Sequence, residues 1–256
     1  MGLAIPQVIT PSKASGAQVI DGSLKFDGTS TYLEKTPSSQ GNRRTFTFSC
    51  WTKRSKFAAY PVLFSAGASS ATSGYLQLSF EIDPLSVYIR HSGGTWVVPT
   101  SAVFRDTSWY HIVMAVDTTA AAASDRVKLY ANGAEQLISS LPTITENYEF
   151  LVNNNGTLHQ VGAGKNSSGA TSVYYDGHLS NVYFIDGQAL GPEYFGFTDP
   201  LTNTWKPKKY TGTFGTNGFY LPMDGNSPIG QDQSGQGNDW TPVNFGGSVA
   251  LDNPQV

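Results

Sequence analysis

The sequence predicts an all-β fold, an antiparallel β-sandwich, and three observations support this class. Charged residues make up 14% of the 256 residues, against about 25% in an average globular domain. Glycine, proline and aromatic residues are frequent, with 27 Gly, 14 Pro and 12% Phe, Trp and Tyr, a composition typical of short strands joined by many turns. Short apolar-polar alternations lie between Asp-Gly and Asn-Gly turns, and no helix longer than two turns is indicated.

Residues 1–16 are expected to form an extended arm, because each of two prolines biases the residue before it toward extended backbone. The apolar residues that would bind a neighbouring subunit are Ile5, Pro6, Val8 and Ile9. They have no periodic apolar partners within this segment. A disordered terminus is the alternative, and the sequence favours neither.

A single domain is expected over residues 17–246, since sandwiches of this length are common. Its clearest strand is 45–53, where Phe46 and Phe48 alternate with polar residues, which predicts a strand with one buried face. Asn132-Gly133 is a strong hairpin signal. The strands expected in the first part of the chain are 17–20, 23–26, 31–34, 45–53, 60–64, 75–82, 85–90, 95–98, 108–116, 126–131 and 134–137.

The second part of the chain is expected to hold strands at 158–162, 172–175 and 179–185 and one helical turn at 191–195. A long loop at 198–217 would cross the sandwich. It would deliver the strand 219–223, within a C-terminal segment 218–246, to pair beside the strands at 17–26 and close the sheet. Residues 247–256 are expected to be a tail.

Packing alone must hold this core, because the chain has one cysteine, Cys50, and therefore no intrachain disulfide. Cys50 lies on the apolar face of its strand and is expected to be an inert core thiol. The side chains expected to be buried are Phe46, Phe48, Tyr110, Ile112, Met114, Leu129, Val182 and Phe184.

Charge and hydropathy exclude two partner classes. The net charge is −3 and the pI is about 5.8, so the chain lacks the basic footprint of a nucleic-acid-binding domain. No secretory signal is visible, and no apolar run is long enough to span a membrane. We therefore expect neither a nucleic-acid nor a membrane partner.

Catalytic motifs are missing from the sequence, so no catalytic residues are assigned and the protein is expected not to be an enzyme. There is no Gly-x-Ser-x-Gly elbow, His-Glu-x-x-His motif or P-loop. Glu81 and Asp83 have the i, i+2 spacing that could begin a glycosidase carboxylate pair. Because Asp83 precedes Pro84 in an expected turn, a glycosidase is the weaker alternative.

No metal ligands or cofactor are assigned either. One cysteine and four dispersed histidines exclude a cysteine-rich zinc site. Calcium is the ion that loop oxygens would suit, and ordinary turn chemistry is the alternative explanation for the acidic residues in turns. The loop aspartates are Asp27, Asp176, Asp186, Asp224, Asp232 and Asp239.

Aromatic residues near turns are candidates for stacking on sugar rings. Trp51 faces away from Phe46 and Phe48 on its strand, Trp96 follows a Gly-Gly turn, and Tyr174 and Tyr175 precede Asp176-Gly177. Core packing is the alternative for each of these aromatics. Trp96, Tyr174 and Tyr175 are the candidate glycan-binding set.

Five sequence blocks resemble laminin-G-like, concanavalin A-like jelly-roll domains over residues 17–190. The blocks are 23–28 (SLKFDG), 46–51 (FTFSCW), 109–113 (WYHIV), 127–133 (VKLYANG) and 175–179 (YDGHL). Further segments resemble laminin-G-like proteins encoded by phages, especially marine tailed phages. These are 41–47 (GNRRTFT), 185–190 (IDGQAL), 204–210 (TWKPKKY) and 234–242 (SGQGNDWTP).

This resemblance implies a non-enzymatic structural protein of a phage virion, as a capsid decoration, fibre or tail component. It would be assembled in the host cytoplasm, with other virion proteins as partners and as a homo-oligomer. The alternative is a carbohydrate-binding adhesin domain that recognises host surface glycans. Ser180 and Asn181 stand where such domains commonly have an acidic pair. In such domains, the motif that residues 220–240 resemble usually precedes the block that 23–28 resembles. In this chain it follows all five blocks.

Overall fold

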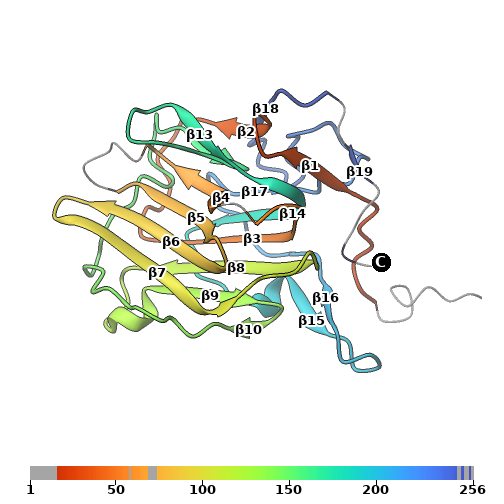
Figure 1. The fold of residues 1–256 in the computed structure, drawn as a ribbon, viewed down its shortest axis with the longest axis horizontal. Coiled ribbons are helices and arrows are strands. Elements are labelled where there is room, and N and C mark those ends of the chain that lie inside the picture. Colours follow the sequence, from red (N-terminus) through yellow and green to blue (C-terminus); the bar gives the residue numbers. More distant parts are fainter. Residues whose placement is uncertain (1–15, 58, 69–73, 247–248, 251–253, 255–256) are drawn as a thin grey trace, which may run out of the picture.

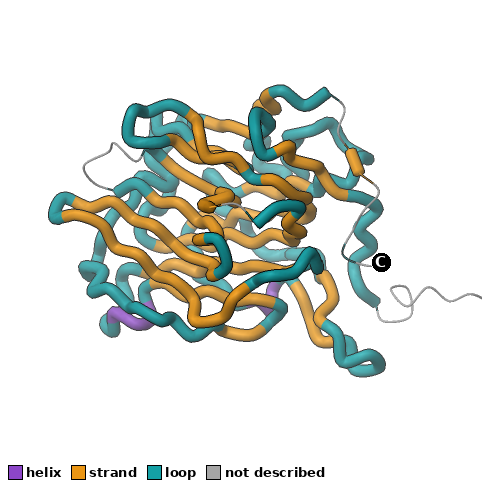
Figure 2. Tube along the Cα trace, in the orientation of Figure 1, coloured by secondary structure: helices purple, strands orange, loops and turns teal. Residues whose placement is uncertain are grey.

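A computed structural model describes residues 16–57, 59–68, 74–246, 249–250 and 254 of the chain. In this part the chain forms antiparallel sheets with two single-turn 3-10 helices, η1 (Ala123–Asp125) and η2 (Pro192–Tyr194). Figures 1 and 2 show strands dominating the fold. Pro192 opens η2, as the sequence predicts. The expected arm, with Ile5, Pro6, Val8 and Ile9, lies outside the described residues.

The first sheet has the order β10-β9-β8-β3-β14-β1-β19, with β17 also paired to β14. Its strands are β1 (Ser23–Asp27), β3 (Thr45–Arg54), β8 (Tyr110–Asp117), β9 (Val127–Ala131), β10 (Ala134–Glu135), β14 (Asp176–Asp186), β17 (Phe219–Leu221) and β19 (Val249–Ala250).

The second sheet has the order β18-β2-β11-β4-β5-β6-β7. Its strands are β2 (Tyr32–Lys35), β4 (Ala59–Ala66), β5 (Leu76–Glu81), β6 (Pro84–His91), β7 (Gly94–Val103), β11 (His159–Val161) and β18 (Thr241–Val243). Two small hairpins accompany the sheets: β12 (Ala163–Lys165) with β13 (Thr171–Tyr174), and β15 (Gly196–Thr198) with β16 (Trp205–Pro207).

The core fills the space between the two sheets, and aromatic rings from both meet in it. Phe48 stacks on Phe64 with ring centroids 4.9 Å apart, and Phe64 in turn stacks on Phe184 at 5.8 Å. Seven of the eight predicted core residues are at most 1% exposed. Tyr110 is the exception: it is half-buried, because its hydroxyl reaches outward and donates to Asp106 at 3.0 Å. Cys50 is buried as predicted, and burial raises the pKa of its thiol.

The outer face of β3 differs from the prediction, which left it half-exposed. Thr47, Ser49 and Trp51 on that face are at most 4% exposed. The segment between β14 and β17, residues 187–217, packs over this face and buries it. Phe195 and Tyr210 from this segment form a second apolar cluster with Tyr183 of β14. The loop predicted at 198–217 is therefore part of a cover, residues 187–217, which we call the lid segment, and it contains the unexpected strand β16.

The C-terminal strand closes the sheet in a different way from the prediction. Leu221 pairs with Val182 of β14 rather than with residues 17–26. Because β1 pairs with the other end of the same edge of β14, strands β17 and β1 lie end to end. Ser180 Oγ lies 3.1 Å from the Gly22 carbonyl oxygen and 3.2 Å from that of Pro222, so it bridges the two chain segments.

Three smaller features also depart from the expected elements. Residues 17–20 form no strand. Instead, the backbone N–H of Gln18 donates to the Pro207 carbonyl oxygen, which ties this segment to the end of β16. Strand β18 was not expected, and it pairs with β2 at the edge of the second sheet. Within the expected tail, Val249 and Ala250 pair with β1.

Replacing Phe48 with alanine tests the core. The side chain is fully buried, so Phe48→Ala should lower the free energy of unfolding by about 3–5 kcal/mol through lost transfer energy and the cavity left behind. Urea unfolding of both proteins measures this difference. A loss under about 1 kcal/mol would contradict the packing described here.

Candidate functional site

The lid segment places one tryptophan, Trp205, back onto the outer face of the first sheet. Strands β15 and β16 form a hairpin at the lower right of the ribbon in Figure 1. The Trp205 indole Nε1–H donates to His111 Nδ1 at 3.0 Å, and the two rings stack at 24° with centroids 5.9 Å apart. A side chain expected in a loop is therefore anchored to the central part of the sheet.

Two glycines make room for the Trp205 ring. A Cβ atom at Gly133 would lie 2.4 Å from ring carbons of Trp205, and one at Gly196 would lie equally close on other ring atoms. Gly133 also has a φ of +82°, a conformation that favours glycine in an Asn-Gly turn. Any larger residue at either position would push the indole off the sheet.

His111 is the buried support beneath the indole. It is 1% exposed, and burial lowers the pKa of its imidazole to about 3, so it is neutral at pH 7. Because the Trp205 indole can only donate, Nδ1 accepts and the ring proton is on Nε2, which donates to Ser49 Oγ at 2.9 Å. The His111 backbone N–H donates to Asn132 Oδ1 at 2.8 Å.

Trp205 and Asn132 line an open cleft with a volume of about 590 Å³, and His111 supports the Trp205 ring from beneath. Trp109 and Trp205 contribute two half-buried indole rings, Trp51 lies among the lining residues but is only 4% exposed, and Lys206 is the one charged side chain among them. The remaining lining residues are Asn132, Thr198, Asn203, Thr204 and Pro254. We call this the tryptophan cleft. It suits a ligand with a flat apolar face and a hydroxyl-rich edge, since the rings offer apolar surface and the rim offers hydrogen-bonding groups.

A second cleft, of about 390 Å³, lies on the second sheet. Tyr60, Tyr88 and Glu81 are among the residues that line it. Glu81 is its one carboxylate among the lining residues, and it accepts a hydrogen bond from Ser86 Oγ at 3.3 Å. Asp83 does not line this cleft, and its carboxylate is paired with Arg105 at 2.8 Å.

The structure does not bring the three predicted glycan-binding aromatics together. Tyr175 is fully buried, and its hydroxyl bonds to Thr52, so this ring offers no surface for stacking. Trp96 is on the second sheet, packed against the core side, where His91 stacks on it at 3.9 Å and Tyr148 meets it edge-on at 5.0 Å.

Tyr174 is half-buried on β13. Its ring lies 6.2 Å from that of Tyr32, and its hydroxyl donates to the Thr171 carbonyl at 3.1 Å. It lines neither of the two clefts.

The loop aspartates proposed for calcium are engaged by protein donors. Asp27, for example, accepts the Ser30 hydroxyl at 2.7 Å and the backbone N–H groups of residues 29–31 at 2.8–3.0 Å. Against the opposing effect of burial, the Ser30 hydroxyl first and then these N–H groups hold its pKa well below the usual value. Asp186 binds Asn42, Asn153 and Asn217 from three separate loops. Among the described residues, no group of three or more His, Cys, Asp or Glu side chains is arranged to hold a metal ion.

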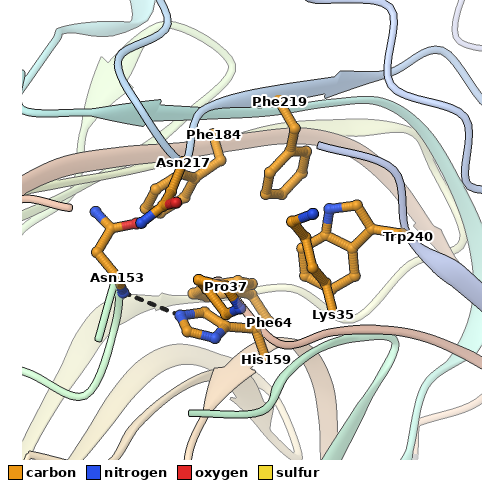
Figure 3. A pocket seen from close by; sticks show the side chains of 9 residues that line it. All are labelled: Lys35, Pro37, Phe64, Asn153, His159, Phe184, Asn217, Phe219 and Trp240. Atoms are coloured by element: carbon orange, nitrogen blue, oxygen red, sulfur yellow. Dashed lines mark hydrogen bonds between the residues drawn. The ribbon is translucent and has the colours of Figure 1, made fainter. Parts of the chain in front are cut away.

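A small cavity inside the sandwich is too small for a glycan. Figure 3 shows its lining, which includes Phe64, Phe184, Phe219 and Trp240. Its volume of about 10 Å³ is that of a single water site. In the described part of the chain, no helix has the length and apolar character needed to cross a membrane.

The comparisons with known proteins agree with the fold. Residues 27–193 match the family model Laminin_G_3, described as the concanavalin A-like lectin/glucanases superfamily. The chain is similar to the native heptameric SAP-like pentraxin from Limulus polyphemus, at 15% identity and a TM-score of 0.55, covering 93% of this chain and 99% of that chain.

Two further solved structures are similar. One is a putative carbohydrate binding protein from Bacteroides ovatus, at 16% identity and a TM-score of 0.54, covering 91% of this chain and 61% of that chain. The other is the IT-sialidase CBM40 of Ruminococcus gnavus, at 14% identity and a TM-score of 0.51, covering 67% and 93%. At these identities the likeness shows the fold. A comparison with curated proteins gives no match.

Mild acid should destabilise the protein through two buried histidines. Burial lowers the pKa of His111 to about 3 and that of His159 to about 4, from 6.5. Below pH 6.5 the unfolded chain therefore binds protons that the folded chain does not, and at pH 5 each histidine costs about 2 kcal/mol of stability. Urea unfolding at pH 7 and pH 5 measures the loss, which should be smaller in His111→Gln. Equal stability at both pH values would contradict the neutral, buried state of these rings.

Proposed function

We propose a non-enzymatic, glycan-binding function for this chain, which belongs to the concanavalin A-like lectin/glucanases superfamily through the match over residues 27–193. The tryptophan cleft is the binding site in this proposal. This assigns the adhesin function that the sequence offered as the alternative to a purely structural one.

The observation that carries the proposal is the pair of half-buried indole rings, Trp109 and Trp205, in one open cleft that the buried Trp51 also lines. Trp51 and Trp205 flank His111, with ring centroids 5.2 and 5.9 Å from it, and Trp109 joins them in the lining. A pyranose ring has one face made of C–H groups and edges made of hydroxyls. Indole rings bury such a face, while asparagine and threonine side chains on the rim bond to the hydroxyls.

The similar solved structures support the same choice. The Bacteroides ovatus protein is named a putative carbohydrate binding protein and the Ruminococcus gnavus domain a CBM40. They share the fold with this chain at low identity, so they favour glycan binding as a function class and assign no residues here.

The virion location stays a prediction. The sequence blocks that resemble phage-encoded proteins motivate it, together with the expected homo-oligomer and the virion partners. On a phage particle, a glycan-binding domain would attach the virion to host surface glycans. Mass spectrometry of purified particles checks this location.

Catalysis is not part of the proposal, because glycoside hydrolysis usually needs two carboxylates flanking the bond. Glu81 has no carboxylate partner among the residues lining its cleft. We expect no reducing-sugar release from polysaccharides, and we expect Glu81→Gln to bind glycans as the unmodified protein does. Sugar release that Glu81→Gln abolishes would instead identify a glycosidase.

Removing an indole from the cleft tests the proposed site. Trp109→Ala and Trp205→Ala should each weaken binding of a glycan selected on an array by about tenfold or more, since buried tryptophans commonly dominate binding energy. Trp96→Ala is the matched control, because Trp96 packs between His91 and Tyr148 on the other sheet.

Titration by tryptophan fluorescence or calorimetry, after circular dichroism has shown that each variant is folded, measures these affinities. Loss of binding in Trp96→Ala with full binding in Trp109→Ala and Trp205→Ala would move the site away from the cleft.

A further inference from the structure

We infer that the tryptophan cleft selects anionic glycans through the ammonium group of Lys206, an inference that rests on the proposed function. Lys206 follows Trp205 on β16 and is half-buried. It is the one charged residue among those lining the cleft, whose other polar members are neutral asparagines and threonines. The cleft therefore presents a single positive charge beside the half-buried rings of Trp109 and Trp205.

The Lys206 ammonium group forms no ion pair with the residues that the structure describes. Within the described residues, no carboxylate lies within 4 Å of its ammonium group, whereas Lys25 pairs with Asp176 at 2.9 Å and Lys128 with Asp125 at 3.3 Å. These two pairs, on β1 and β9 of the first sheet, show that other lysines of the chain do have acidic partners.

The charge of Lys206 lowers the pKa of the Asp199 carboxyl group. The carboxylate oxygens of Asp199, however, accept hydrogen bonds from other groups. Asp199 accepts the Leu201 backbone N–H at 2.9 Å and the Thr202 hydroxyl at 3.0 Å. The Leu201 bond contributes most to holding the pKa of Asp199 below its usual value, and the charge of Lys206 contributes least. Asp199 thus bonds within its own loop through both oxygens, and among the described residues it forms no ion pair with Lys206.

The cost of removing water from the Lys206 ammonium group should make the cleft prefer anionic sugars to neutral ones. A neutral sugar that fills the cleft removes water from the ammonium group and supplies no opposite charge, which opposes binding. A carboxylate or sulfate on the sugar replaces that water with a charge-assisted hydrogen bond. Two ligand sources share this chemistry, carboxylated sugars and sulfated sugars.

The test compares matched ligands on the full chain. A galacturonic acid trimer carries carboxylates, its methyl ester is the neutral counterpart, and a sulfated galactan oligosaccharide of similar length supplies sulfate. Tryptophan fluorescence titrations in 50 mM salt should show the acid trimer or the sulfated oligosaccharide binding about tenfold or more tightly than the methyl ester, as expected for a hydrogen bond to a charged group. The tighter of the two identifies the source.

Variants assign the selectivity to one residue. Lys206→Met keeps the aliphatic stem and removes the charge, so it should bind acidic and neutral ligands within about twofold of one another, while Lys206→Arg should keep the preference. Lys208→Met is the control, because the Lys208 ammonium donates to the Glu193 carbonyl and lies outside the cleft lining.

The outcomes separate this inference from the proposed function. Equal binding of the neutral and anionic ligands by the unmodified protein, or a preference that survives in Lys206→Met, overturns the inference and leaves glycan binding intact. If the unmodified protein binds only neutral glycans on the array, the inference is likewise overturned and the proposed function stands. If no glycan of any class binds, the proposed function fails and the inference fails with it.

Discussion

The hydrogen bond from the Trp205 indole to His111 is the contact on which the candidate site depends. It joins a hairpin of the lid segment to β8, a strand in the middle of the first sheet. His111 can accept this bond because burial keeps its ring neutral, and the bond from Nε2 to Ser49 of β3 fixes the tautomer. The indole is thus held by the same sheet that forms the core, so the floor of the cleft is set before any ligand arrives.

The lid segment is itself positioned by the long strand β14. Asp186, at its end, is 7% exposed and accepts hydrogen bonds from loops at Asn42, Asn153 and Asn217. From Asp186 the lid segment turns over the outer face of the first sheet. Tyr183 of β14 also stacks on Tyr220 of β17, with ring centroids 4.3 Å apart. One strand therefore pairs with β1, β3 and β17 and also starts the segment that builds the cleft.

Local patterns in the sequence predict the sheets well, because strand alternation and turn residues act over a few positions. Phe46 and Phe48 alternate with polar residues and are buried, Asn132-Gly133 forms its hairpin turn, and the laminin-G-like family is confirmed. Contacts between distant segments were not predictable in this way. The outer face of β3 carries Thr47 and Ser49 and therefore resembles an exposed face, yet the lid segment covers it.

The site was missed for the same reason. Trp205 lies in a run rich in proline, threonine and lysine that resembles a loop, and its partners His111 and Gly133 are remote in sequence. An NMR titration of the five indole N–H groups with a bound glycan tests the account most directly. A glycan in the tryptophan cleft should shift the indole resonances of Trp109 and Trp205, which are half-buried in its lining, and leave those of Trp96 and Trp240 unchanged. Shifts confined to Trp96 or Trp240, or no shift in any indole on saturation, would contradict it.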